Sequence, residues 1–236
     1  MLFISPPFGN YNFLPNAMSI EGSFTLHYRP GLIQQIFKTL KFNTEKNGWV
    51  NKIGLRNPGI DYAIKYYNKN NIVSIAIINA SDIDYIENKI PKDMNIELNI
   101  SCPNIDHKLV SYGLDTFLNK KRKWCIIKLS PTTKINKVDY YYNIGFRQFH
   151  CCNTIPIKEG GLSGPEIKNY SLPMIKSIKM KYPDTTIIGG GGIRTMKDIE
   201  EYRKAGADHF SVSTLCFSPL GLLRLYWNYN KTSSSA

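Results

Sequence analysis

The sequence predicts an α/β fold, a single (β/α)8 barrel. Short runs rich in β-branched and aromatic residues alternate with segments of helical periodicity, the pattern of βα units around a parallel sheet. The chain has 236 residues, of which 42% are hydrophobic, enough for one sizeable core. The expected strands are residues 2–5, 23–28, 72–79, 96–100, 125–129, 146–152, 185–189 and 209–213.

Helical patterns fill most of the connections. The expected helices are residues 60–68, 82–90, 109–121, 134–143, 171–181, 196–204 and 220–227, with Ser81 and Thr195 as N-caps of the second and sixth. The prolines between the first two strands limit that connection to a turn or two of helix around residues 14–19. Between residues 28 and 72 we expect an extra helix after Pro30 and an accessory strand within residues 49–55. The barrel domain is expected to span residues 1–230, followed by a disordered tail at 231–236.

Composition indicates a cytoplasmic protein without a membrane segment. No run approaches the roughly 18 apolar residues that span a bilayer, and the first residues lack the features of a signal peptide. Five cysteines, mostly within apolar runs, favour reduced thiols. The net charge of +12 comes from lysines spread along the chain, which favours a solvated surface over a nucleic-acid site. The scattered histidines predict no metal site.

The fourth strand leads directly into a polar turn with a thiol. Ile96, Leu98 and Ile100 alternate with polar residues, and Pro103 ends the strand. Cys102 therefore lies at the C-terminal tip of a strand, where barrel enzymes carry their chemistry. A free cysteine is often only a small buried hydrophobe, but a thiol in a polar turn favours a proton acceptor or nucleophile.

Other strand ends predict a site for an anionic ligand. Four glycines at 189–192 follow the seventh strand, and Ser213 and Thr214 follow the eighth, where many barrels bind phosphate through backbone N–H groups. Lys128 shares a strand face with Ile126 and needs a negative partner, which favours a cofactor or substrate anion at the mouth over a surface-facing lysine. Asparagines near the same ends can either cap turns or bind a planar polar ligand. They are Asn51, Asn99, Asn104 and Asn153.

These motifs together resemble the dihydroorotate dehydrogenases. The matching segments are residues 97–104 (ELNISCPN), 127–131 (IKLSP), 153–154 (NT), 160–164 (GGLSG), 188–193 (IGGGGI) and 205–208 (AGAD), with 51–59 (NKIGLRNPG) similar to the family's asparagine-bearing loop. Their order and spacing match most of the chain. The turn around Cys102 is the most specific of them, whereas the glycine motifs alone would be weak.

The resemblance implies a TIM-barrel flavoprotein that uses FMN to oxidise dihydroorotate to orotate in pyrimidine biosynthesis. Cys102 would remove a proton from C5 while a hydride passes from C6 to flavin N5, and Lys128 would stabilise the reduced flavin beside its N1/O2 edge. A cysteine base is similar to that of the soluble class. The implied substrate-binding residues are Asn51, Asn99, Asn104, Asn153 and Thr154; those for the cofactor are Ser5, Asn99, Lys128, Gly164, Gly191, Gly192, Ser213 and Thr214.

The chain also departs from the family pattern. It is shorter than most members, which predicts a compact barrel with reduced accessory loops at its C-terminal face, and a Lys-Ser or Lys-Thr pair expected after the second strand is replaced by His27 and Tyr28. The resemblance implies a homodimer and leaves the electron acceptor open. Two alternatives compete: a flavin barrel acting on uracil in RNA, as dihydrouridine synthases do, and a non-catalytic flavin-binding barrel.

Overall fold

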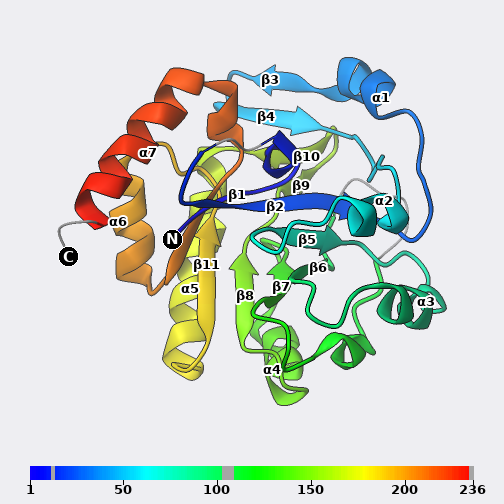
Figure 1. Cartoon of the computed structure of the whole chain (residues 1–236). Coiled ribbons are helices and arrows are strands. Elements are labelled where there is room, and N and C mark those ends of the chain that lie inside the picture. The colour runs from blue at the N-terminus through cyan, green and yellow to red at the C-terminus, as the bar shows by residue number, and fades with distance from the viewer. Residues whose placement is uncertain (12–13, 103–108, 234–236) are drawn as a thin grey trace.

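The computed structural model describes residues 1–11, 14–102 and 109–233, and its centre is a closed barrel. The barrel strands pair in parallel in the order β1-β12-β11-β8-β7-β6-β5-β2 (Figure 1). This confirms the predicted (β/α)8 barrel. The strands are β1 (Leu2–Ile4), β2 (Ala17–Phe24), β5 (Ile72–Ile75), β6 (Ile96–Asn99), β7 (Cys125–Leu129), β8 (Gln148–Cys151), β11 (Thr186–Gly190) and β12 (His209–Val212).

Helices surround the barrel and cover its apolar outer face. Leu98 and Phe149 on the strands belong to one buried cluster with Ile86, Val138 and other helix residues. The helices are α2 (Ile60–Lys65), α3 (Asp82–Lys89), α4 (Ile135–Asn143), α5 (Lys168–Lys181), α6 (Met196–Ala205) and α7 (Pro219–Ser233), with short 3-10 turns η1 (Phe8–Tyr11), η2 (Leu114–Phe117), η3 (Pro165–Ile167) and η4 (Thr214–Phe217). Across the described residues, no helix combines the length and apolar composition needed to cross a membrane.

The accessory structure is an antiparallel sheet with one helix beside it. Its strands β3 (Lys41–Asn43), β4 (Gly48–Asn51), β10 (Gly160–Ser163) and β9 (Ile155–Ile157) pair in the order β3-β4-β10-β9. Figure 1 shows β3, β4 and α1 (Leu32–Thr39) along one edge of the molecule, beyond the first barrel strands. The extra helix and accessory strand expected between residues 28 and 72 are therefore present, as α1 and β4.

The barrel interior is divided into an apolar layer and a polar layer. Phe3, Ile20, Ile72, Trp124, Ile126 and Ile188 form their own buried cluster. Two residues further along the same strands come Ser5, Ser74 and Lys128, which are also buried. Because successive side chains of a strand alternate between faces, these polar residues point into the barrel one layer nearer the C-terminal ends.

The second strand differs from its prediction. It covers Ala17–Phe24 instead of residues 23–28, and its beginning replaces the helical turn expected at 14–19. Ile20 pairs with Ile72 of β5 and is fully buried in the inner apolar layer. Polar Ser19, Glu21 and Ser23 alternate with only a few apolar residues, and Gly22 interrupts the apolar positions. The neighbours β1 and β5 pair with the strand on both sides and support its conformation.

Three helical predictions are corrected as well. Only η2 forms within the helix expected at 109–121, because Gly113 adopts a left-handed φ of 69°. Ser81 precedes α3 without a capping hydrogen bond, whereas Thr195 and Asp198 form a full capping box on α6. The tail predicted at 231–236 is helical through Ser233, and residues 234–236 lie outside the described part.

Candidate active site

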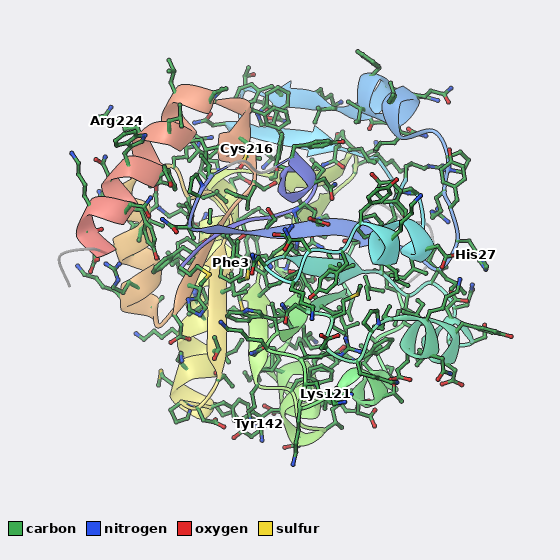
Figure 2. The ribbon with its side chains drawn as sticks, in the orientation of Figure 1. Phe3, His27, Lys121, Tyr142, Cys216 and Arg224 are labelled. Carbon is green, nitrogen blue, oxygen red and sulfur yellow. The ribbon has the colours of Figure 1, made fainter. Side chains whose placement is uncertain are left out.

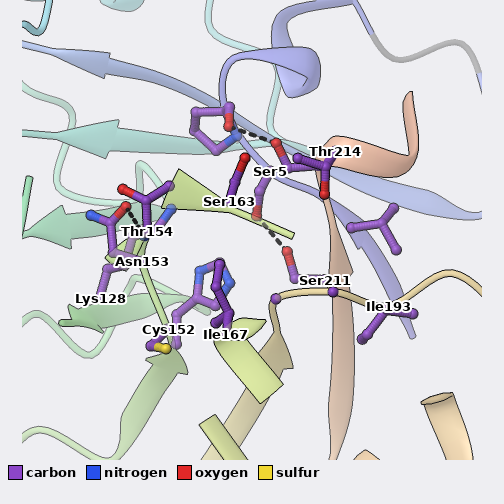
Figure 3. Close-up of a pocket in the computed structure, with 16 residues that line it drawn as sticks. Ser5, Lys128, Cys152, Asn153, Thr154, Ser163, Ile167, Ile193, Ser211 and Thr214 are labelled. Carbon is purple, nitrogen blue, oxygen red and sulfur yellow. Dashed lines mark hydrogen bonds between the residues drawn. The ribbon is translucent and has the colours of Figure 1, made fainter. Parts of the chain in front are cut away.

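A polar cavity opens at the C-terminal ends of the barrel strands. The space enclosed by its lining is about 80 Å³, and about 510 Å³ when the open mouth is counted. Figure 3 shows side chains from the ends of several strands converging on it. The lining comprises Ser5, Pro6, Lys128, His150, Cys152, Asn153, Thr154, Ser163, Ile167, Gly191, Gly192, Ile193, Ser211, Val212, Ser213 and Thr214.

Two of the predicted asparagines form a hydrogen-bonded pair at this end of the barrel. The side-chain amide of Asn153, after β8, donates to Asn99 Oδ1 at 3.1 Å and to the Ser101 carbonyl at 3.1 Å. Asn99, at the end of β6, donates in turn to Ser23 Oγ at 2.9 Å. The ends of β2, β6 and β8 are thereby joined by polar side chains, a donor and acceptor set suited to a planar polar ligand.

Cys102 directly follows Ser101, which belongs to the same hydrogen-bonded group as the two asparagines. Ser101 donates through its hydroxyl to the Lys128 carbonyl at 3.0 Å, and its own carbonyl accepts from Asn153. These bonds fix the chain next to the half-buried Cys102 onto β7 and the end of β8. Cys102 is not part of the cavity lining. Asn104 lies outside the described residues.

A second cysteine reaches the cavity but is unsuited to act as a base. Cys152 lines it directly, and burial raises the pKa of its thiol to about 12. The thiol therefore stays protonated near neutral pH. Burial also raises the thiol pKa of Cys151 and Cys216, the other cysteines near the strand ends. This leaves Cys102 as the candidate for proton removal.

Beneath the asparagines, three charged or titratable side chains meet inside the barrel. The fully buried Glu97 accepts from Ser74 Oγ at 2.8 Å, from Lys128 Nζ at 3.4 Å and from His150 Nδ1 at 2.6 Å. Burial alone would raise the pKa of Glu97, but Lys128, His150 and the hydrogen bonds bring it down to about 2. Lys128 is thus paired within the protein, with Glu97, whereas the sequence favours a cofactor or substrate anion as its negative partner.

The opposite side of the cavity offers hydroxyls and glycine backbone. Ser163, Thr214 and the loop at Gly191 and Gly192 line it. Gly191 and Gly192 have φ values of 102° and 71°, a region that favours glycine. Tyr202 on α6 fixes this backbone by donating to the carbonyls of Gly190 at 2.8 Å and Gly191 at 2.7 Å.

The chemistry of this donor set suits the phosphate of an anionic cofactor such as FMN. Hydroxyls and glycine N–H groups on one side of the cavity suit a phosphate, and buried Lys128 on another supplies a cation. Of the predicted cofactor residues, Ser213 lines the cavity and donates to the Pro6 carbonyl at 3.1 Å. Gly164 is not part of the lining and precedes η3. Predicted Ser5 contacts Ser211 through its hydroxyl, as Figure 3 shows.

Other predicted residues lie further from the cavity. Asn51 ends β4 of the accessory sheet, where its Oδ1 accepts from the Ile53 N–H at 3.4 Å. His27 is exposed and borders a separate hollow with Asp82 and Tyr85, and Figure 2 shows it at the edge of the molecule. Near the C-terminal end of β2, Ser23 accepts the hydrogen bond from Asn99 instead. The Lys-Ser or Lys-Thr replacement attributed to His27 and Tyr28 stays a prediction.

From the sequence, no role is predicted for two residues of the barrel interior, Glu97 and His150. Glu97 lay between apolar residues and gave no signal of its own, because the inner face of a barrel strand near the mouth is polar while its outer face is apolar. His150 is one of the scattered histidines, whose spacing predicts no metal site and no other role. His150 and Cys152 are two residues apart in the predicted strand and therefore share a face. This spacing is the sequence signal that His150 faces inward.

A parallel eight-stranded barrel with a polar cavity at its C-terminal end defines a TIM-barrel enzyme of the kind that binds an anionic cofactor there. The family model of dihydroorotate dehydrogenase matches residues 118–219. The catalytic subunit of dihydroorotate dehydrogenase B (NAD(+)) from Petrotoga mobilis is 33% identical over 215 residues, covering 76% of this chain and 71% of the relative. The Oceanobacillus iheyensis protein of the same name is 30% identical over 205 residues, covering 72% and 67%.

The chain belongs to the dihydroorotate dehydrogenase family, whose members are FMN-dependent oxidoreductases. A solved structure agrees on the fold: dihydroorotate dehydrogenase from Eimeria tenella, in complex with ferulenol, superposes with a TM-score of 0.67 at 17% identity, over 88% of this chain and 73% of that one. The resemblance noted from the motifs is confirmed.

Proposed function

We propose that this protein oxidises dihydroorotate to orotate, with Cys102 as the general base. The observation that carries the proposal is the hydrogen-bonded group of Asn99, Asn153 and Ser101, which joins the chain at Cys102 to the cavity that holds Lys128. Membership of the family supports the substrate and the cofactor. The chemistry supplied by bound FMN is acceptance of a hydride.

The residues of this chain would bind, orient and deprotonate the substrate. The amides of Asn99 and Asn153 offer donors and acceptors to the pyrimidine ring, and Thr154 lies beside them. The Cys102 thiolate takes the proton from C5, while the hydrogen at C6 leaves with its electron pair. The C5–C6 double bond of orotate forms from the electrons released at C5.

Lys128 would supply a fixed positive charge at the cofactor. Its ammonium is already desolvated and paired with Glu97, so it needs little reorganisation when negative charge develops nearby. Ser5, Gly164, Gly191, Gly192, Ser213 and Thr214 are proposed for the ribityl phosphate side, Asn51 and Asn104 for the substrate. The homodimer implied by the resemblance stays a prediction.

The reductive half-reaction tests this proposal directly. The purified protein is loaded with FMN, and its visible absorption is followed after anaerobic addition of dihydroorotate. Wild type should bleach, and Cys102→Ala should bind FMN normally but bleach about 10²-fold to 10⁴-fold more slowly, the usual contribution of a general base. Cys102→Ser should be intermediate.

A cysteine at the other end of the barrel provides the control. Cys125 begins β7 and its thiol contacts the Phe117 carbonyl, away from the cavity. Cys125→Ala should bleach at the wild-type rate. If Cys102→Ala also bleaches at that rate, Cys102 is not the base. If FMN-loaded wild type does not bleach, dihydroorotate is not the substrate.

A further inference from the structure

His150 lies inside the barrel with its two ring nitrogens in different environments. Its side chain is 2% exposed, and Nδ1 is 2.6 Å from Glu97 Oε2. The ring also lines the cavity. The charged residue Lys128 lies in the same layer and reaches the other oxygen of Glu97.

Glu97 fixes which nitrogen carries the proton. Its pKa, held at about 2, keeps the carboxylate ionised at neutral pH, so it can only accept hydrogen bonds. Burial lowers the pKa of His150 more than the carboxylate raises it, which favours the neutral ring. Nδ1 therefore donates to Glu97, and Nε2 keeps its lone pair.

Within the described part of the chain Nε2 has no hydrogen-bond partner, and the ring lines the cavity. No described residue forms a hydrogen bond with it. Among the described side-chain nitrogen and oxygen atoms, those that are both shielded from solvent and unpartnered belong to Arg29, Arg56, Arg122 and Trp124. Nε2 of His150 is not in this group, so it is not shielded from solvent. Next to it, Gly190 carries no side chain; a Cβ there would lie 3.3 Å from Nε2 and 3.1 Å from the Ser211 side chain.

We propose that His150 is a cofactor-positioning residue whose Nε2 accepts a hydrogen bond from a hydroxyl or N–H group of bound FMN. Lys128 supplies a donor in the same layer, so the pair offers the ligand one acceptor and one cation. Glu97 holds both in place. This inference rests on the FMN binding of the proposed function but does not depend on dihydroorotate being the substrate.

Substitutions of His150 can separate the bond to Glu97 from the group that faces the cavity. The amide of Asn reaches about as far as Nδ1, so His150→Asn keeps a donor for Glu97 and removes the acceptor at Nε2. Apoprotein is titrated into FMN, and the quenching of flavin fluorescence gives Kd. Loss of one hydrogen bond should raise Kd about three- to tenfold and shift the visible absorption maximum of the bound flavin. His27→Asn is the matched exposed control and should leave both unchanged.

A second pair keeps the test decisive if His150→Asn does not fold. Gln and Leu are similar in size and both give up most of the bond to Glu97, but only Gln retains a polar group near the position of Nε2. His150→Gln should therefore bind FMN more tightly than His150→Leu. Equal Kd values for these two, or a wild-type Kd and spectrum in His150→Asn, overturn the proposal. Wild type that binds FMN without being reduced by dihydroorotate contradicts only the proposed substrate, whereas wild type that takes up no FMN overturns both.

Discussion

Replacing Glu97 by Gln removes the charge at the centre of the polar layer while keeping the size of the side chain. The carboxylate has two acceptor oxygens that serve Ser74, Lys128 and His150. An amide has only one acceptor oxygen, and its NH2 group must face at least one of these donors. The Lys128 ammonium, buried in the barrel, would also lose its counter-ion. We expect a protein that is less stable but has the same fold.

The magnitude follows from the pKa of Glu97. Its depression from 4.5 to about 2, at about 1.4 kcal/mol per pH unit, corresponds to about 3 kcal/mol of stabilisation of the charged form. Breaking a buried ion pair by removing one partner typically costs about 3–5 kcal/mol. In a chain of this size each kcal/mol lowers Tm by about 2–4 °C, so Tm should fall by roughly 6–20 °C.

Urea denaturation at pH 7, followed by circular dichroism, measures the effect as a free energy of unfolding. Glu200→Gln is the control, because Glu200 pairs with Arg203 on the exposed surface of α6 and should cost no more than about 1 kcal/mol. The difference between wild type and Glu97→Gln should also depend on pH. A depressed carboxyl pKa stabilises fully above 4.5, and this stabilisation is lost as the pH falls toward 2. Equal losses for the two variants at pH 7 would refute the ion-pair reasoning.

Two further predictions concern the ends of the barrel. Burial and the Met1 ammonium lower the pKa of His209 from 6.5 to about 4; the unfolded chain therefore binds more protons over that interval, and stability should fall as the pH drops through it. His209→Gln should show a smaller fall in Tm between pH 7 and pH 5 than wild type. An equal fall would mean that His209 does not contribute to the pH dependence of stability. At the cavity, Gly190→Ala adds a methyl group 3.1 Å from Ser211, and the crowding should weaken FMN binding about tenfold, or about 1.4 kcal/mol, in the fluorescence titration. An unchanged Kd would mean that the ligand stays clear of this wall.

The sequence was most informative where strand periodicity was strong. The predicted strand at residues 125–129 matches β7 residue for residue. Its apolar side chains are buried on both faces: Ile126 packs in the apolar layer inside the barrel, and Ile127 packs in the cluster between strands and helices. It was least informative at β2, where polar residues alternate with few apolar ones. That segment becomes a strand because β1 and β5 supply hydrogen-bonding partners on both sides, which local patterns cannot reveal.

The asparagine pair could be anticipated because Asn99 ends β6 and Asn153 closely follows β8. The network of Glu97, Lys128 and His150 could not, because these residues are 31 and 53 positions apart from Glu97 and their contact depends on the register of three neighbouring strands. Side chains of adjacent barrel strands meet only where the stagger brings them to the same level.

The polar layer also explains why alternation alone gave Glu97 no role. In an isolated sheet, apolar Ile96 and Leu98 would mark the buried face and Glu97 the solvated one. In this barrel the apolar face packs on helices, and the other face points into the interior, where Glu97 is completely buried. Such a charge persists only with partners. Because the partners Lys128 and His150 both line the cavity, the ion pair that maintains the barrel interior also determines the charge presented to the ligand.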